Sequence, residues 1–191
     1  MVTQRAADWD PSAEAPDGLE RVRRFMNSLD LYRDRDQLSD VEQAQQLLHG
    51  LPDVGGEVRA DKSVLPEVRL ARAAMRQLVG CTTLWSLPEH DSTPEATPDW
   101  STSPRLLVGA NGFALDGHDL HSLLAEMTLD LYVAQRAGSI GRLKPCANPS
   151  CQWVFWDTSR PGTGRWCSMR LCGGQHKSRQ FRARRVAASR E

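Results

Sequence analysis

Apolar side chains recur at helical spacing in four stretches of the chain, and these stretches predict four helices. The first begins after Asp17, its expected N-cap, with Glu20 in the capping-box position. The second is expected to start at Ser39 as N-cap, with Glu42 completing a capping box, and to end at Gly50. The apolar positions of these two helices are Leu19, Val22, Phe25, Met26, Leu29, Val41, Ala44, Leu47 and Leu48.

The third and fourth stretches, residues 64–79 and 119–137, are longer, and each is closed by a glycine. In the third we expect Arg69 and Arg76 to lie away from the stripe that faces the core. The stripe of the third helix is Leu65, Val68, Ala71, Arg72, Met75, Leu78 and Val79, and that of the fourth is Leu120, Leu123, Leu124, Met127, Leu131 and Val133.

Other patterns interrupt the helices. Residues 105–108 and 113–115 predict two short strands joined by a tight turn at Asn111–Gly112, which is typical of a β-hairpin. Residues 86–104 are rich in Pro, Ser, Thr and acids and predict a loop. Residues 1–17 hold little that could be buried, so we expect a flexible lead-in.

The chain is expected to be mainly α-helical with a small β-hairpin. Its 191 residues suffice for one ordinary domain and a small module. We expect a helical N-terminal domain over residues 18–141 and a four-cysteine zinc-finger module over residues 142–191. The boundary is expected near Gly141 to Lys144, with a separate core on each side.

Charge divides the chain at the same place. Residues 142–191 hold eleven Lys and Arg against two acids, a net charge of +9, so the remaining 13 Lys and Arg and 22 acids give residues 1–141 a net charge of −9. A basic segment of this kind indicates an anionic polymer or surface as its partner. The polar start of the chain lacks the apolar core of a signal peptide, and no stretch has the roughly 20 apolar residues of a membrane span, so we expect a cytoplasmic protein with no membrane partner.

Four cysteines form two pairs of identical spacing, and they predict a metal site. Cys146 and Cys151 make one C-x4-C pair, and Cys167 and Cys172 make the other. In a reducing compartment such pairs favour one tetrahedral structural zinc ion over two disulfides or buried free thiols. Four cysteines already fill the tetrahedron, so a catalytic zinc or a ligand role for His176 is the weaker interpretation.

The segment between the cysteine pairs predicts a hairpin. Residues 153–156 form a strand pattern, residues 160–164 a turn, and Arg165–Trp166 a returning strand. The three tryptophans of this segment are expected mostly in the core, although they could stack on bases. So small a module needs its metal to fold.

Chemistry outside the cysteine pairs is sparse. Cys81 stands alone among apolar residues and is expected to be a small buried side chain. Asp116, His118, Asp119 and His121 cluster at the start of the fourth helix, where an enzyme site is the alternative to a helix cap with exposed neighbours. We favour the cap, and we expect no enzyme activity and no catalytic residues.

Two stretches resemble known modules. The run CANPSCQWVFWDTSR, followed by RWCSMRLCG, closely resembles the CGNR-type zinc finger at the C-terminus of a bacterial family regarded as transcription regulators. The run RFMNSLD at residues 24–30, followed by Asp36–Gln37–Leu38, is similar to the opening of that family's ABATE-type N-terminal domain. The resemblance spans about residues 19–185 and is most specific in the zinc finger.

This resemblance implies a structural zinc on Cys146, Cys151, Cys167 and Cys172, and DNA binding by the C-terminal module. The chain departs from the family at its name-giving CGNR run, where Gly174 and Gln175 stand in place of Asn and Arg. If that Arg contacts nucleic acid in the family, one contact is missing here, whereas the metal ligands are intact.

The segment after the last cysteine is basic and predicts a helix over residues 175–190. Its cations can neutralise phosphates, or they can be a solvated face. We therefore expect a DNA-binding regulator whose N-terminal domain senses a small-molecule effector or a partner, or forms a homodimer; the alternative is a zinc-stabilised RNA-binding or protein-interaction module. The expected nucleic-acid contacts are Arg165, Arg170, Lys177, Arg179, Arg182, Arg184 and Arg185.

Overall fold

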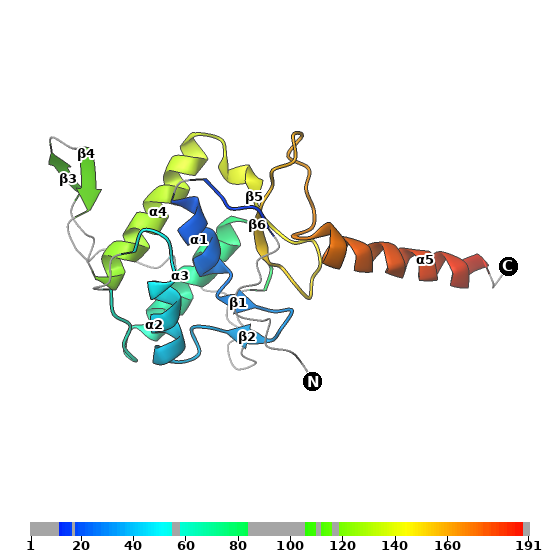
Figure 1. The fold of residues 1–191 in the computed structure, drawn as a ribbon, viewed down its shortest axis with the longest axis horizontal. Coiled ribbons are helices and arrows are strands. Elements are labelled where there is room, and N and C mark those ends of the chain that lie inside the picture. The colour runs from blue at the N-terminus through cyan, green and yellow to red at the C-terminus, as the bar shows by residue number, and fades with distance from the viewer. Residues whose placement is uncertain are drawn as a thin grey trace.

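The computed structural model describes residues 12–16, 18–54, 58–83, 106–109, 112–115 and 119–188, and for both strands within residues 106–115 it describes the backbone alone. In these ranges the chain is mainly helical with small antiparallel hairpins, as predicted (Figure 1). The helices are α1 (Leu19–Met26), α2 (Val41–His49), α3 (Leu65–Leu78), α4 (Leu120–Arg136) and α5 (Gly174–Ala188). The paired strands are β1 (Leu29–Asp30) with β2 (Arg35–Asp36), β3 (Leu106–Gly109) with β4 (Gly112–Leu115), and β5 (Leu143–Pro145) with β6 (Val154–Trp156).

Helix α1 forms the centre of the helical part, where it packs on α4 and α3 (Figure 1). Its side chains Val22, Phe25 and Met26 are fully buried, as their spacing predicts. On its outer side Arg21 bridges to Glu126 at 2.7 Å and to Asp130 at 2.8 Å, which ties α1 to α4. None of the helices in the described ranges has the length and apolar character needed to cross a membrane.

The end of the predicted lead-in packs against the helical domain. Of residues 1–17, the structure describes only 12–16, where Ala13 forms a β-bridge with Trp156 and Ala15 is buried. The backbone N–H of Ala15 donates to the Glu20 carboxylate at 2.9 Å. Glu20 therefore accepts from the chain five residues before it. The N-cap of α1 is Gly18, one residue after the expected cap, Asp17, which itself lies outside the described residues.

The second helix begins one residue later than predicted. Asp40, rather than Ser39, is the N-cap of α2, and its side chain accepts from the backbone N–H of Gln43 at 2.8 Å. Asp40 has the extended backbone of a cap, and both residue types suit the position, so spacing alone did not distinguish them.

Helix α3 corrects one expectation. Arg76, predicted to lie away from the core-facing stripe, is fully buried, and so is Arg72 one turn before it. Arg69 instead reaches the carbonyl of Leu38 at 2.6 Å and thereby holds the segment before α2. The spacing of apolar residues does not predict a buried arginine, because it depends on side-chain type and ignores the hydrogen-bond partners that allow a cation to be buried.

The remaining elements of the N-terminal domain are of the predicted type, with differences in detail. The hairpin β3–β4 forms as predicted, but its register differs: Gly112, expected at the centre of the turn, lies in β4 and pairs with Gly109, so that Val108 lies opposite Phe113. The loop predicted over residues 86–104 lies outside the described residues. Asp119 caps α4 by accepting from the N–H of Ser122 at 2.9 Å. The bond from the Ser122 hydroxyl at 2.7 Å, together with this N–H bond, lowers the pKa of the Asp119 carboxyl. Val133, predicted for the apolar stripe, is 57% exposed.

The hairpin in the C-terminal part differs from the predicted one. Strand β6 pairs with β5, which precedes the first cysteine, and not with Arg165–Trp166. Buried Leu143 and Val154 from this hairpin join the same apolar core as the helices, while Phe155 packs among the four cysteines. The expectation of separate cores is therefore corrected, because the hairpin contributes side chains to both.

Candidate metal centre and nucleic-acid interface

The first cysteine pair lies on the connection between β5 and β6. The N–H of Cys146 donates to the carbonyl of Trp153 at 2.9 Å, and the N–H of Cys151 donates to the carbonyl of Asn148 at 2.9 Å. These bonds fold the loop around Pro149 so that both thiols point to the same side. The hairpin therefore positions this pair through its backbone.

The second pair spans a tight helical turn. Residues Met169–Gly173 form a π-helical turn (η2), and the side chain of Ser168 accepts from the N–H of Leu171 at 3.3 Å to cap it. Cys167 precedes this turn and Cys172 lies within it. The N–H of Ala147 donates to the carbonyl of Arg165 at 2.8 Å, which brings the two pairs together.

The four predicted cysteines meet in one buried cluster. Their sulfur atoms all lie within 4.8 Å of one another. The Sγ atoms of Cys151 and Cys167 are 3.7 Å apart, and those of Cys167 and Cys172 are 3.9 Å apart. A tetrahedron with Zn–S bonds of about 2.3 Å has edges of about 3.8 Å. The geometry thus fits one structural zinc ion with four thiolate ligands.

The four thiols also affect one another's protonation. Hydrogen bonds from Cys151 and Cys167 lower the pKa of Cys146, while the same crowding raises the pKa of both donors. Four buried thiolates cannot all ionise side by side unless a cation is bound among them. The amide of Asn148 donates toward Cys172 Sγ at 3.5 Å and supplies a further dipole.

Two other candidates lie outside the cluster. The ring of His176 packs against Trp166, with ring centroids 4.8 Å apart, and His176 is not among the clustered donors of the described residues. Cys81 is buried, as predicted, and its Sγ donates to the carbonyl of Gln152 at 3.8 Å. Burial raises the pKa of the Cys81 thiol.

The loop between the cysteine pairs is organised by Asp157. This residue is 3% exposed, and it accepts from Lys144 Nζ at 2.8 Å and from the N–H of Gly164 at 2.7 Å. Burial acts to raise the pKa of Asp157, but these bonds and those from Ser159 outweigh it and keep the pKa well below its usual value. The ionised carboxylate therefore holds the loop at neutral pH.

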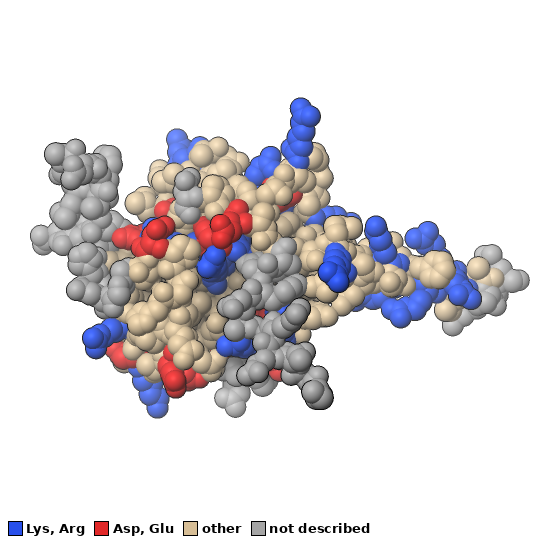
Figure 2. Space-filling model, viewed as in Figure 1, with Lys and Arg blue, Asp and Glu red and all other residues tan. Residues whose placement is uncertain are grey.

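Helix α5 leaves the metal centre and extends away from the rest of the molecule (Figure 1). Every residue from Lys177 to Ala188 is exposed. The helix contains five Lys and Arg and no Asp or Glu, and Figure 2 shows its basic side chains along the protruding segment. The seven predicted contact residues are all exposed: Arg165, Arg170, Lys177, Arg179, Arg182, Arg184 and Arg185.

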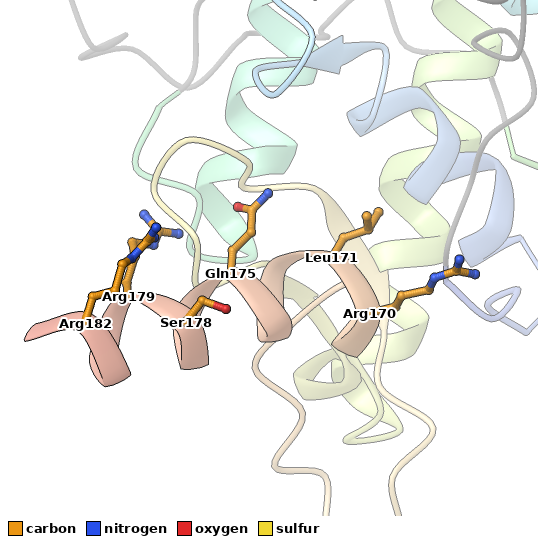
Figure 3. A pocket seen from close by; sticks show the side chains of 6 residues that line it. All are labelled: Arg170, Leu171, Gln175, Ser178, Arg179 and Arg182. Atoms are coloured by element: carbon orange, nitrogen blue, oxygen red, sulfur yellow. The ribbon is translucent and has the colours of Figure 1, made fainter. Parts of the chain in front are cut away.

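One side of η2 and α5 is hollowed into an open groove of about 390 Å³. Figure 3 shows Leu171, Gln175 and Arg179 rising from the same side of the helix. The groove is lined by Arg170, Leu171, Gln175, Ser178, Arg179 and Arg182. Three guanidinium groups, a hydroxyl and an amide are donors suited to phosphate oxygens.

The departure from the CGNR run has a structural setting. Gln175 Nε2 donates to the Tyr32 hydroxyl at 2.9 Å, so this side chain reaches the β1–β2 turn of the helical domain. A Cβ on Gly174 would lie 3.6 Å from the carbonyl of Met169, an ordinary contact, so the backbone does not require glycine there. A Cβ on Gly173 would lie 2.9 Å from Met169 Sδ, so a larger residue there would require the flexible, exposed Met169 side chain to shift.

The candidate enzyme cluster is only partly described. Asp119 is a helix cap, and His121 Nε2 lies 3.2 Å from the Glu67 carboxylate on α3. Asp116 and His118 lie outside the described residues.

Sequence reasoning missed three residues that hold the first cysteine pair. The side chain of Asn27 makes two hydrogen bonds of 2.7 Å with the backbone of Val154, and Gln152 accepts from the N–H of Thr82 at 2.7 Å. Arg76 donates to the carbonyl of Gln152 at 3.3 Å. Asn27 belongs to the RFMNSLD run, so the family resemblance could have pointed to this residue, whereas the spacing of apolar residues could not.

Comparison with known proteins agrees with the geometry of the metal site. A search of curated proteins finds no match to the chain. Residues 142–185 match the family model of the CGNR zinc finger, and the four clustered cysteines lie within this segment. The C-terminal part of the chain is therefore a zinc-finger module of the CGNR type, with a site suited to one structural zinc ion.

Proposed function

We propose that the chain is a DNA-binding transcription regulator in which the zinc-finger module binds duplex DNA through α5. The observation that carries this proposal is the exposed helix itself: it projects from the metal centre and bears Lys and Arg with no acidic residue. Zinc would act structurally, by holding the start of this helix on the module. No step of the proposal requires catalysis.

Electrostatics supports a nucleic-acid partner. Each phosphate that Lys or Arg neutralises releases condensed counterions, which gives affinity that does not depend on sequence. Arg179 and Arg182 lie next to each other on the groove beside α5, where a backbone phosphate could accept from both guanidinium groups, and Arg170 lines its other end. The neighbouring side chains of Ser178 and Gln175 offer further donors.

The helical domain is proposed to carry regulation. Residues 24–30 resemble an ABATE-type domain, and in that interpretation residues 18–141 sense a small-molecule effector or a partner, or form a homodimer. Tyr32 links this domain to α5 through Gln175, so a change in the β1–β2 turn would reach the proposed DNA-binding helix.

One observation favours a second candidate, an RNA-binding or protein-interaction module. Gln175 occupies the position of the family Arg, and it donates to Tyr32 rather than projecting alone into solvent. A residue used in this way is less available to nucleic acid. Single-stranded RNA would then compete with duplex DNA, or neither would bind.

A salt titration tests the proposal. The zinc-loaded chain should bind a fluorescent random duplex with an affinity that falls steeply as salt increases, measured by anisotropy. The double variant Arg179→Ala/Arg182→Ala should lower the slope of log K against log salt by about 2, because two phosphate contacts are lost. Arg59→Ala is the matched control, since this exposed arginine lies beside α2, whose Gln45 bonds both neighbours of Arg59.

The outcomes separate the candidates. No duplex binding at low salt by zinc-loaded protein would overturn the proposal. If single-stranded RNA bound more tightly than duplex DNA in competition, the ligand would be RNA and not DNA. If the double variant and the control changed the salt slope equally, α5 would not be part of the DNA interface.

A further inference from the structure

Arg76 on α3 is a cation buried in the helical core. Its side chain is 0% exposed, and its donors meet only backbone carbonyls: Nη1 donates to Met26 at 2.9 Å, and Nη2 donates to Gln152 at 3.3 Å and to Thr83 at 3.5 Å. Among the described residues its Nε has no hydrogen-bond partner, and the same is true of Arg72 Nε. A buried charge is costly unless an opposite charge lies nearby.

Arg72, one turn earlier on the same helix, shows the usual solution. It is equally buried, but both terminal nitrogens of its guanidinium donate to the Asp36 carboxylate, with Nη2 2.8 Å from Oδ2. Among the described residues, no ion pair with a carboxylate involves Arg76. The two arginines thus differ in the partner of their charge and not in their burial.

Two anionic groups act on Arg76: the Asp36 carboxylate, which is already paired with Arg72, and the cysteine cluster. Gln152, whose carbonyl accepts from Arg76, directly follows the ligand Cys151 in the chain. Burial and the neighbouring Arg72 lower the pKa of Arg76, while any negative charge on Cys81, on Cys151 or on Asp36 acts to raise it. A zinc ion with four thiolates has a net charge of 2 − 4 = −2, and this charge is buried as well.

We propose that Arg76 is a positioning residue of the zinc centre, which holds the Cys146–Cys151 loop through the Gln152 carbonyl and offsets part of the negative charge of the zinc tetrathiolate. The helical domain thereby supplies an outer contact of a metal site whose four ligands all lie in the C-terminal module. This inference concerns zinc retention, so it stands whether or not the module binds DNA.

The coupling must act in both directions. If the folded helical core strengthens zinc binding, bound zinc stabilises the packing around α3 by the same free energy. Removal of zinc would take away the negative charge of the zinc tetrathiolate near Arg76. The free energy of unfolding of the helical domain would then decrease. The zinc finger and the helical domain would then respond to zinc as one unit.

Zinc competition with a chromophoric chelator, on the full chain, tests the proposal. Arg76→Met should weaken zinc binding by about tenfold or more, the usual effect of losing an outer-shell contact, and Arg76→Lys should restore part of the loss because it keeps the charge. Arg72→Met is the matched control: it removes an equally buried cation from the same helix, and we expect zinc affinity to change by less than about threefold. Equal weakening by both Met variants, or no weakening by Arg76→Met, would overturn the proposal.

A measurement on the unmodified chain covers the case in which Arg76→Met does not fold. Hydrogen exchange of peptides from α3 should slow when zinc is added to chelated protein, and peptides from α2 should change less, since α2 does not contribute to the Gln152 contacts. Unchanged exchange in α3 between the zinc-loaded and zinc-free chain would overturn the proposal.

Discussion

The two cysteine pairs of the zinc finger lie in different environments. Around Cys146 and Cys151, Asn27 and Arg76 bind backbone groups of the hairpin. The N–H groups of Thr82 and Thr83 donate to the side-chain oxygen of Gln152, which directly follows Cys151. Cys167 and Cys172 are followed by a helix whose residues 177–188 are all exposed. One half of the site is therefore supported by a protein core, and the other depends on the metal and on short-range turns.

The largest expected effect comes from removing a ligand in the less supported half. Cys167→Ser should abolish zinc binding and unfold α5, because structural zinc contributes on the order of 10 kcal/mol to such modules. Peptides from β5 and β6 should keep much of their protection, since Leu143 and Val154 are in the helical core. Hydrogen exchange with mass spectrometry measures both changes.

Cys81→Ser is the control for this experiment, since Cys81 is outside the cluster and should leave the zinc content at one ion per chain. Complete loss of protection across α1, α3 and α4 in Cys167→Ser would contradict the difference between the halves.

A smaller effect is expected from the contact that supports the first half. Asn27→Ala removes two hydrogen bonds and leaves the N–H and carbonyl of Val154 buried and unpaired, at a cost of about 2–4 kcal/mol in the free energy of unfolding. Urea unfolding measures this cost. Gln46→Ala, an exposed amide on α2, should change stability by less than about 0.5 kcal/mol. A cost below that of the control would show that the helical domain does not hold the hairpin.

The smallest effect concerns the loop that joins the halves. Asp157→Asn should cost about 2 kcal/mol at pH 7, because a charge-assisted bond to Lys144 is lost. The folded-state pKa of Asp157 is depressed, so its stabilisation is present above the unfolded pKa of about 3.9 and is lost only as pH falls through the folded value. The difference in unfolding free energy between variant and wild type should thus stay constant from pH 7 to pH 5. A difference that shrinks within this range would contradict the depressed pKa.

The sequence predicted the elements better than their contacts. Cysteine spacing located the metal cluster, and apolar spacing located α1 to α4, because both signals are local. The pairing of β6 was wrong because a strand can pair on either side, and the aromatic run at residues 153–156 does not state which partner the core favours. Arg76 was placed wrongly for a related reason: the partners of a buried arginine can lie far away in the chain, as the Gln152 carbonyl does, 76 residues further on.

The π-helical turn at Met169–Gly173 has a consequence for how α5 forms. Starting a helix is the unfavourable step, since several residues must be fixed before the first hydrogen bonds compensate, and a 15-residue helix without packing is marginal in water. Cys172 lies in the turn that directly precedes α5, so a metal bound there fixes the first turn in advance. Zinc then serves as the nucleus of the helix, and the later residues only extend a turn that already exists.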